Sequence, residues 1–580
     1  MAILDELVIG KYDSTINITD TDRISQLPES LLHQILSLLP ESEAARTIFL
    51  SKIWRRAWKS HPRIFNFSFC FPYSDYSSYD DDDGYLKSKT VDEGKRVLGF
   101  FNEILSVLSQ RLHKVMFIEI FQLSLPLYVP ESESHVSKIL DLLTKHRVGE
   151  IEIHLAPQIQ LTSKSYGYSF EFNYNYTPLP SNITDAKLLD GLNLEGFQFK
   201  EGMFKGAMFS SLKKLSLVDC AINPKTIYDL LACCPLLEIF HLHHYAREAF
   251  PSLKICGHSK LKKVSLKGFT KWVQISLPNL ETLSIYLYYG GNIFKCPNLK
   301  TLKIACDCIS NKMINEFTSK FRSLETLILD GRCCSKRIQI ATHKLRGLAL
   351  LFGGQPPLVN IEAPNLCWYK YVARELLHCG NCINSNSLSH VHLQFSFSRD
   401  IGPAWFLHLR ENLAMFHQQV TVIVELMLNW TNMNHFDPAE LGNFSSVPTP
   451  PQLECLKLVD VPEQIDYKAL LDCLLWSCHP NYLTCNEVPL GVQPEFQHTH
   501  DEFIEFLCRE LIYTTEESVV CCEEEQNFKC WRHYKKYAEI VDEKYDEIKI
   551  SEGHHAKALS ETNVDSHMKE LIKFMLEWFF

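Results

Sequence analysis

Residues 212–217 read LKKLSL, and this spacing of three leucines decides the fold of most of the chain. The same pattern, an apolar residue followed by two more apolar residues three and five positions later, recurs along the sequence. Its copies begin at Leu189, Leu212, Leu237, Leu261, Leu280, Leu299, Leu324, Leu345, Leu366, Leu388 and Leu453. Alternation of apolar and polar residues is typical of a short strand with one buried face. Because one such unit cannot hide its own apolar side, the sequence predicts units that stack and share a core.

Successive copies start 19–25 residues apart as far as Leu388, and a gap of 65 residues precedes the last one. Nearly all of these spacings lie in the period of leucine-rich repeats. We therefore expect an α/β fold in which residues 93–488 form an irregular leucine-rich-repeat solenoid, or horseshoe, around one parallel sheet. The alternative is an ordinary α/β domain with coincidental leucines, which the regular spacings argue against.

The units differ in the segment that returns from one strand to the next. Residues 224–233 predict a helical return, whereas the segment between 280 and 299 is too short for a full helix. A helix at 404–417 and a strand at 420–426 are expected in the long gap. The polar strand positions could face a partner or only water. They are Lys213, Lys214, Ser216, His241, Lys262, Lys263, Ser265, Ser284 and Lys303.

Residues 22–58 read DRISQLPESLLHQILSLLPESEAARTIFLSKIWRRAW and carry three helical signals. This stretch is too short to fold alone, and its apolar surface is large for its length. Tryptophan, which occurs here at positions 54 and 58, is enriched among residues that dominate interfaces. The stretch is therefore predicted to dock on another protein, although its apolar faces could also pack on one another and on the domain behind.

The same stretch resembles the F-box of plant F-box/leucine-rich-repeat proteins. The resemblance rests on Asp-Arg-Ile-Ser-x-Leu-Pro from Asp22, Leu-Leu-x-x-Ile-Leu-Ser-x-Leu-Pro from Leu31 and Leu-Ser-Lys-x-Trp-Arg-x-x-Trp from Leu50. Two mild departures are Ile53, where many family members have arginine, and the acidic segment 41–46. The resemblance implies a three-helix F-box module at 22–66 that binds a Skp-family adaptor and, through it, a cullin. The implied adaptor-binding residues are Leu27, Pro28, Leu31, Leu32, Ile35, Leu36, Leu50 and Trp54.

Other segments flank these two regions. Residues 1–21 are expected to be a flexible tail, and residues 67–92 an acidic linker around the run Asp80–Asp83. That run lacks the glycine and closing glutamate of an EF-hand calcium loop. Residues 450–488 resemble the FBD-type region of the same plant family. Residues 489–580 are predicted to be a helical C-terminal region, ending in an apolar-faced helix at 568–580.

Composition narrows the functional classes. The net charge of −11 argues against a nucleic-acid binder, and the local basic clusters at 55–63 and 529–536 are expected to be solvated helix faces. A secretory signal and an 18-residue apolar run are both missing, so an intracellular protein of cytoplasm or nucleus without a membrane span is expected. The 21 cysteines are then expected to be reduced thiols. The pair Cys379 and Cys382 lacks a second ligand pair, so no metal and no other cofactor are predicted.

The sequence also lacks a phosphate-binding GxxxxGK[ST] loop, a GxSxG nucleophile motif and an HExxH motif. It therefore predicts a protein without catalytic activity. Together with the resemblance, this implies the substrate-recognition subunit of a cullin–RING ubiquitin ligase, whose target the sequence does not identify. The alternatives are a leucine-rich-repeat scaffold unrelated to ubiquitin and an enzyme whose site is assembled from distant residues. No small-molecule pocket is predicted.

Overall fold

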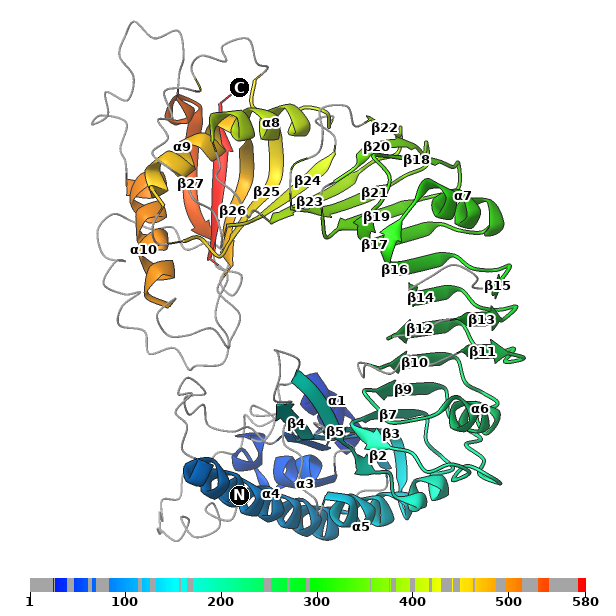
Figure 1. Ribbon diagram of the computed structural model, residues 1–580. Helices are drawn as coiled ribbons and strands as arrows, with labels where there is room; N and C mark the ends of the chain where they lie inside the picture. The colour runs from blue at the N-terminus through cyan, green and yellow to red at the C-terminus, as the bar shows by residue number, and fades with distance from the viewer. Residues whose placement is uncertain are drawn as a thin grey trace, which may run out of the picture. The chain divides into compact units, whose positions relative to one another are not determined.

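The structure is a computed structural model that divides into two compact units, residues 1–246 and 247–580 (Figure 1). It describes residues 24, 27–38, 46–60, 65–68, 83–112, 117–125, 132–155, 158–163, 170–244, 252–268, 272–287, 293–354, 356–374, 376, 382–396, 402–416, 420–428, 441, 449–462, 465–486, 497–513, 530–541 and 572–579. No helix among these residues has the length and apolar character needed to cross a membrane.

The first unit is built on a parallel sheet. Its strands, in spatial order, are β1 (Phe65–Ser68), β2 (Phe117–Leu125), β3 (Arg147–Leu155), β7 (Gly191–Glu195), β9 (Lys214–Val218) and β10 (Ile239–His243). Two small pairs accompany it: β4 (Gln158–Ser163) with β5 (Phe170–Asn175), and β6 (Thr177–Pro178) with β8 (Phe197–Gln198). The helices are α1 (Glu29–Leu38), η2 (Thr47–Phe49), α3 (Lys52–Ser60), α4 (Asp83–Arg111), α5 (Ser132–Thr144), η3 (Ser181–Asp185) and α6 (Pro224–Ala232).

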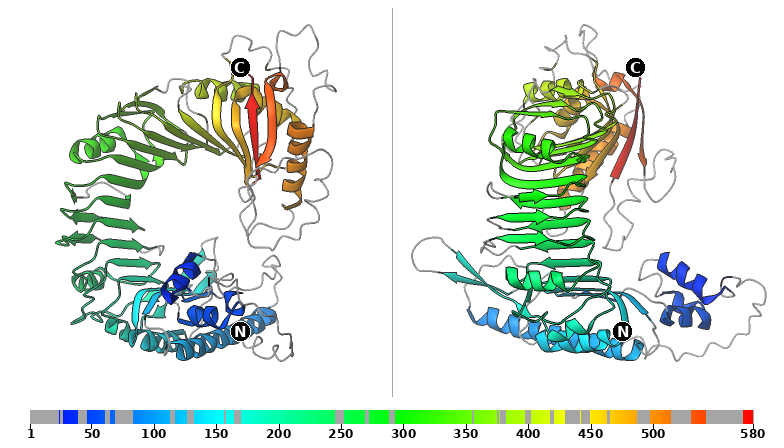
Figure 2. Two further views of the ribbon diagram at one scale, coloured as in Figure 1. Left: turned by 180° about the vertical axis from the view of Figure 1, so that it is seen from behind. Right: turned by 90° about the vertical axis from the view of Figure 1, so that its right-hand side faces the viewer.

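The second unit carries a longer ladder whose strands follow one another like rungs (Figure 2). Ten parallel strands run in spatial order: β12 (Lys263–Lys267), β14 (Thr282–Leu287), β16 (Thr301–Ile309), β17 (Thr326–Cys333), β19 (Gly347–Phe352), β21 (Trp368–Ala373), β23 (His390–Ser396), β24 (Thr421–Met427), β25 (Gln452–Val459) and β26 (His479–Asn486). The antiparallel strands β28 (Ile572–Trp578) and β27 (Lys535–Val541) continue the sheet beyond β26.

Two short parallel sheets and several helices complete this unit. One sheet is β11 (Leu253–Cys256), β13 (Val273–Ser276) and β15 (Ile293–Lys295); the other is β18 (Arg337–Ala341), β20 (Leu358–Glu362) and β22 (Cys382–Asn384). The helices are α7 (Asn311–Lys320), α8 (Pro403–Leu413), α9 (Tyr467–Ser477), α10 (Gln497–Cys508), η6 (Arg509–Tyr513) and η7 (Trp531–His533). Helices α8 and α9 are joined by buried polar groups: Ser477 Oγ donates to the Phe406 carbonyl, and Arg410 donates to the Trp476 carbonyl.

The repeated leucines form the core because equal positions of successive strands lie side by side. Leu192, Leu215 and Phe240 are register partners on β7, β9 and β10, and each is at most 3% exposed. Leu327 and Leu348 repeat the arrangement in the second unit. Burying a leucine or phenylalanine contributes roughly 1.5–3 kcal/mol, so the stacked rows stabilise the ladder at every step.

Local sequence signals account for the segments that return from one strand to the next. Helix α6 begins after Asn223, whose side chain accepts a hydrogen bond from the Thr226 N–H, and Pro224 occupies its first turn. Helix α8 and strand β24 lie in the long gap between the last two repeats, where the sequence predicts a helix and a strand. Strand β24 pairs with both β23 and β25, so the ladder continues through the gap.

Three expectations were wrong. The closing segment is strand β28 and not a helix, because Phe574, Leu576 and Trp578 are buried alternately, with a period of two. Strand β27 also lies in the region predicted as helical, beside α10, η6 and η7. Helix α4 begins at Asp83, so residues 83–92 of the predicted linker are helical.

A further difference concerns the cysteines. Cys308 and Cys334 form a disulfide, with Cα atoms 5.6 Å apart, where reduced thiols were expected throughout. Cys308 lies near the end of β16 and Cys334 directly follows the neighbouring strand β17, and this stacking of repeats places them within bonding distance. Sequence spacing alone does not reveal such a pair.

Candidate functional site

Helices α1 and α3 of the first unit form a small apolar core. Leu32 and Leu36 from α1 pack with Trp54 and Ala57 from α3, and all four are at most 5% exposed. Leu27, Ile35 and Trp58 are partly buried against this cluster. The core explains why α3 carries apolar residues three to four positions apart: that spacing turns them toward α1.

A second set of apolar residues in this module points to solvent. Leu31 is 41% exposed, Phe49 and Leu50 are each 67% exposed, and Ile53 is 39% exposed. Ile53 comes three positions after Leu50 and four after Phe49, a spacing typical of side chains on one helical face. Water-exposed apolar groups gathered in this way are a common mark of a protein-binding surface.

The eight predicted adaptor-binding residues therefore divide into three groups. Leu32, Leu36 and Trp54 belong to the module's own core, and Leu27 and Ile35 are partly buried against it. Pro28, Leu31 and Leu50 are exposed. Phe49 and Ile53 were missed by sequence reasoning, although the spacing of Ile53 from Phe49 and Leu50 was a usable signal.

The open face of the first ladder carries polar groups that satisfy one another. Glu150 reaches across Gly191 to accept a hydrogen bond from Lys214, its neighbour two strands away. His154 Nδ1 lies 2.9 Å from Glu195 Oε2, and this hydrogen bond raises the pKa of His154. The charged groups of these pairs are thus already matched within the ladder.

The open face of the second ladder is different in composition. Lys303, Lys370 and Lys457 have no ion-pair partner within the part of the chain that the structure describes. Trp368 lies across Gly347 of the adjacent strand. Of the polar strand positions predicted from sequence, Ser265 is buried, at 7% exposure, and the others are exposed or half-buried.

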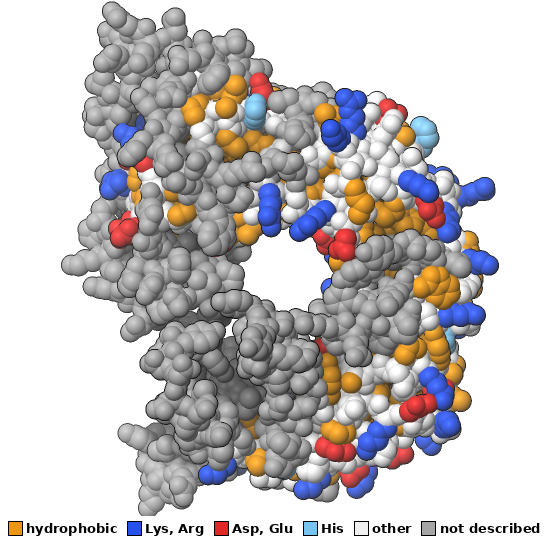
Figure 3. Space-filling view, viewed as in Figure 1, with side chains coloured by type: hydrophobic (Ala, Val, Ile, Leu, Met, Phe, Trp, Pro, Cys, Tyr) orange, Lys and Arg blue, Asp and Glu red, His pale blue; other side chains and the backbone are white. Residues whose placement is uncertain are grey.

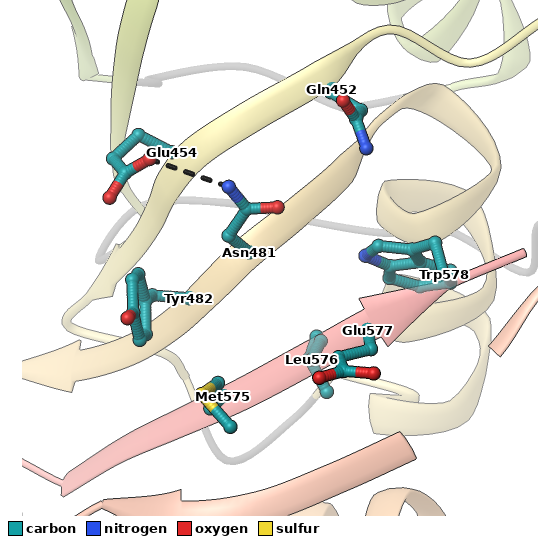
Figure 4. Close-up of a pocket in the computed structure, with 8 residues that line it drawn as sticks. All are labelled: Gln452, Glu454, Asn481, Tyr482, Met575, Leu576, Glu577 and Trp578. Atoms are coloured by element: carbon teal, nitrogen blue, oxygen red, sulfur yellow. Dashed lines mark hydrogen bonds between the residues drawn. The ribbon is translucent and has the colours of Figure 1, made fainter. Parts of the chain in front are cut away.

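A pocket of about 400 Å³ lies where β28 adds to β26 (Figure 4). Its lining residues come from three strands and are Gln452, Glu454, Asn481, Tyr482, Met575, Leu576, Glu577 and Trp578. Asn481 donates to Glu454 over 3.4 Å, and the Trp578 indole N–H donates to the Pro480 carbonyl over 2.8 Å. The pocket was not predicted, because half of its wall is the strand that the sequence led us to expect as a helix.

Several cysteine thiols of the chain are buried. Burial raises the pKa of Cys220, Cys478 and Cys485 to about 12, so these thiols stay protonated and unreactive near neutral pH. Within the described ranges, no three His, Cys, Asp or Glu side chains gather as metal ligands would. Of the CxxC pair, Cys382 begins β22, and Cys379 lies outside the described residues.

Comparison with known families matches two parts of the chain. The F-box domain model matches residues 24–66, and the model described as "FBD-associated F-box protein At5g56370, LRR repeats" matches residues 168–292. The first match covers the module formed by α1, η2 and α3. The second covers the last strands of the first unit and the first strands of the second.

Similar curated proteins come from Arabidopsis thaliana. The chain is 26% identical over 357 residues to the putative F-box/FBD/LRR-repeat protein At4g03220, covering 57% of this chain and 64% of that protein. It is 26% identical over 375 residues to the putative F-box/FBD/LRR-repeat protein At4g13965, covering 63% and 71%. It is 52% identical over 48 residues to the F-box/FBD/LRR-repeat protein At3g26920, covering 8% and 11%. The chain thus spans less than two thirds of the first of these relatives. The chain thus carries an F-box followed by FBD-associated leucine-rich repeats, the make-up of the plant F-box/leucine-rich-repeat proteins to which it is similar.

Proposed function

We propose that this protein is the substrate-recognition subunit of an SCF-type cullin–RING ubiquitin ligase. The F-box, as a three-helix module, would bind a Skp-family adaptor, and the two ladders would act as a leucine-rich-repeat solenoid that holds a target protein. The protein would perform no bond chemistry itself. It would raise the local concentration of target lysines near the ubiquitin-carrying enzyme, which converts a rare encounter into a local one.

The observation that carries the proposal is the exposed apolar surface of the F-box module. Leu31, Phe49, Leu50 and Ile53 are exposed although the module has a core of its own. An apolar surface beside a completed core is best explained by a partner that covers it. Among the residues with an implied adaptor role, Pro28, Leu31 and Leu50 are therefore proposed as direct contacts, and Leu32, Leu36 and Trp54 as residues that hold these contacts in place.

The test measures binding of the full chain to a purified Skp adaptor. The double variant Leu31→Asp with Leu50→Asp is expected to weaken binding by at least about tenfold, because it places two charges in an apolar interface. Leu188 supplies the matched control: it is a leucine of the same unit, 61% exposed and outside the F-box. Leu188→Asp should bind the adaptor as the wild type does.

The alternative, a leucine-rich-repeat scaffold unrelated to ubiquitin, predicts a different result. Wild-type protein that is folded and yet does not bind the adaptor would favour the scaffold. Equal binding by the wild type and the double variant would leave the ligase function in place but would remove the proposed contact surface.

A further inference from the structure

The open face of the second ladder between β16 and β25 has its own pattern of side chains. One row of register partners reads Lys303, Ile328, Ala349, Lys370, His392 and Ile423. The next row, two residues along each strand, reads Asp330, Leu351, Val372, Gln394, Glu425 and Lys457. Since strand side chains alternate, these rows lie on the side opposite the buried leucines.

The first half of this face, from β17 to β21, carries three large apolar side chains beside Asp330 and Lys370. Ile328, Leu351 and Val372 are only half-buried, although they are placed on the open side of the sheet. Trp368 is on the same side of β21 as Lys370 and Val372, two residues before Lys370, and its indole lies over Gly347 of β19. In the space-filling view, hydrophobic side chains of the second unit lie beside lysine and arginine side chains (Figure 3). We call Ile328, Leu351, Val372 and Trp368 the Trp368 patch.

Gly347 makes the position of Trp368 possible. Gly347 is the register partner of Trp368 on β19, and a Cβ atom there would lie 2.2 Å from the indole Cε2. The indole therefore occupies the space of the missing side chain and lies over the neighbouring strand. A tryptophan held in one orientation loses little freedom on binding, which favours it as an anchor for a partner.

The second half of the face, from β21 to β25, is basic. In this half, Glu425 is the one carboxylate in the two rows. His392 Nε2 lies 3.4 Å from Glu425 Oε2. The hydrogen bond from His392 lowers the pKa of Glu425, and the nearby charges of Lys457 and Lys370 lower it further. Two lysines and a histidine thus surround a single carboxylate, so this half carries an excess of positive charge that an added carboxylate would balance.

We propose that the Trp368 patch and the adjoining Lys370, His392 and Lys457 bind an acidic peptide segment that carries a large apolar side chain. The apolar side chain packs on Trp368, and the carboxylates that accompany it pair with the lysines. The inference rests on the proposed function in one respect: the peptide segment would belong to the target protein. The recognition itself depends only on the second ladder.

The full chain can be tested against an array of synthetic 12-residue peptides that pair one Leu, Phe or Trp with Asp and Glu. A matched array carries Lys and Arg in place of the acids. Wild-type protein should bind the acidic array in preference to the basic one. Trp368→Ser should weaken binding to the acidic peptides about tenfold. Lys370→Glu combined with Lys457→Glu should reverse the preference toward the basic array.

Arg337 supplies a matched control, because it is an exposed residue of β18 in the other sheet of the same unit. Arg337→Glu should leave the preference for acidic peptides unchanged. The proposal is overturned if the wild type prefers neither array, if the charge-reversed variant keeps the wild-type preference, or if an oligonucleotide of equal charge competes better than the acidic peptides. The wild type is also tested for adaptor binding, which reports separately on the F-box: a wild type that prefers acidic peptides but does not bind the adaptor contradicts the proposed function and not the peptide site.

Discussion

The indole of Trp368 lies in the space that a side chain at Gly347 would occupy on the neighbouring strand. The Trp368 indole of one repeat therefore requires a residue without a side chain at the register position in the repeat before it. The same device recurs in the first unit, where Glu150 passes over Gly191 to reach Lys214. In both ladders, a glycine on the open face thus leaves room for a side chain from the adjacent strand.

Gly347→Ala is expected to displace the Trp368 indole, because the added methyl group cannot share its space. The cost in the free energy of unfolding should be about 1–3 kcal/mol, as for other overpacked sites. Retention of acidic peptides should also fall about tenfold, even though no contacting side chain has been removed. Gly353→Ala, where a new Cβ meets no atom within 4 Å, is the control for both measurements and should change neither.

Within the F-box, substitution by alanine is predicted to change the stability of the module strongly at Leu36 and hardly at all at Leu50. Leu36 is fully buried and Leu50 is 67% exposed. Leu36→Ala should destabilise the module by about 2–5 kcal/mol, whereas Leu50→Ala should change its stability by no more than about 0.5 kcal/mol. Hydrogen exchange of the α1 and α3 amides measures both effects. Equal protection in the two variants would contradict the division into core and surface.

Lowering the pH should weaken the packing of β28 on β26, because His479 of β26 becomes protonated. His479 is 2% exposed, and its ring stacks on Trp578 with centroids 4.1 Å apart. Burial lowers its pKa from 6.5 to about 4, and the charge of Arg410 acts in the same direction. Because the folded pKa lies below the unfolded one, the unfolded chain takes up the proton first as pH falls. About 3 kcal/mol of stability should therefore be lost between pH 6.5 and 4.

Denaturant unfolding of the second unit, followed at several pH values in this range, measures that loss. His479→Gln should flatten the dependence, since glutamine does not titrate. The exposed His343→Gln is the control and should keep the wild-type slope. A wild-type slope that persists in His479→Gln would show that another group is responsible.

His154 should act in the opposite sense. Its hydrogen bond with Glu195 raises its pKa above 6.5, so the folded state holds the proton more tightly than the unfolded state. The resulting stability is fully present below pH 6.5 and is lost as pH rises through the folded pKa. NMR titration of the imidazole should show the raised pKa, and Glu195→Gln should return it toward 6.5. An unchanged pKa in Glu195→Gln would rule out this pair as the cause.

Sequence reasoning succeeded where one strong periodic signal repeats. The spacing of Leu212, Leu215 and Leu217 predicted β9, and the same pattern predicted the core positions of the following strands. Helix α6 and strand β24 were also predicted close to their observed bounds. Each of these elements buries one face, so its pattern records its environment in the residues themselves.

Sequence reasoning failed where a segment fits both a helical and a strand period. It also failed where packing against a neighbouring element determines which residues are buried. The segment from Ile572 to Trp578 is rich in large apolar residues and fits a helix as easily as a strand; pairing with β26 and β27 selects the strand. In the F-box, Leu32 and Leu50 are both apolar residues at helical spacing, and only the packing of α1 on α3 separates a core residue from a surface one.

The sequence by itself determined the F-box, the repeat period and the buried row of leucines, because these depend on local spacing and on hiding apolar side chains from water. The tertiary structure alone decided which residues meet: Trp368 with Gly347, His479 with Trp578, and His392 with Glu425. Those meetings depend on register between strands tens of residues apart in sequence. Register is set by stacking of the whole ladder, which no single repeat encodes.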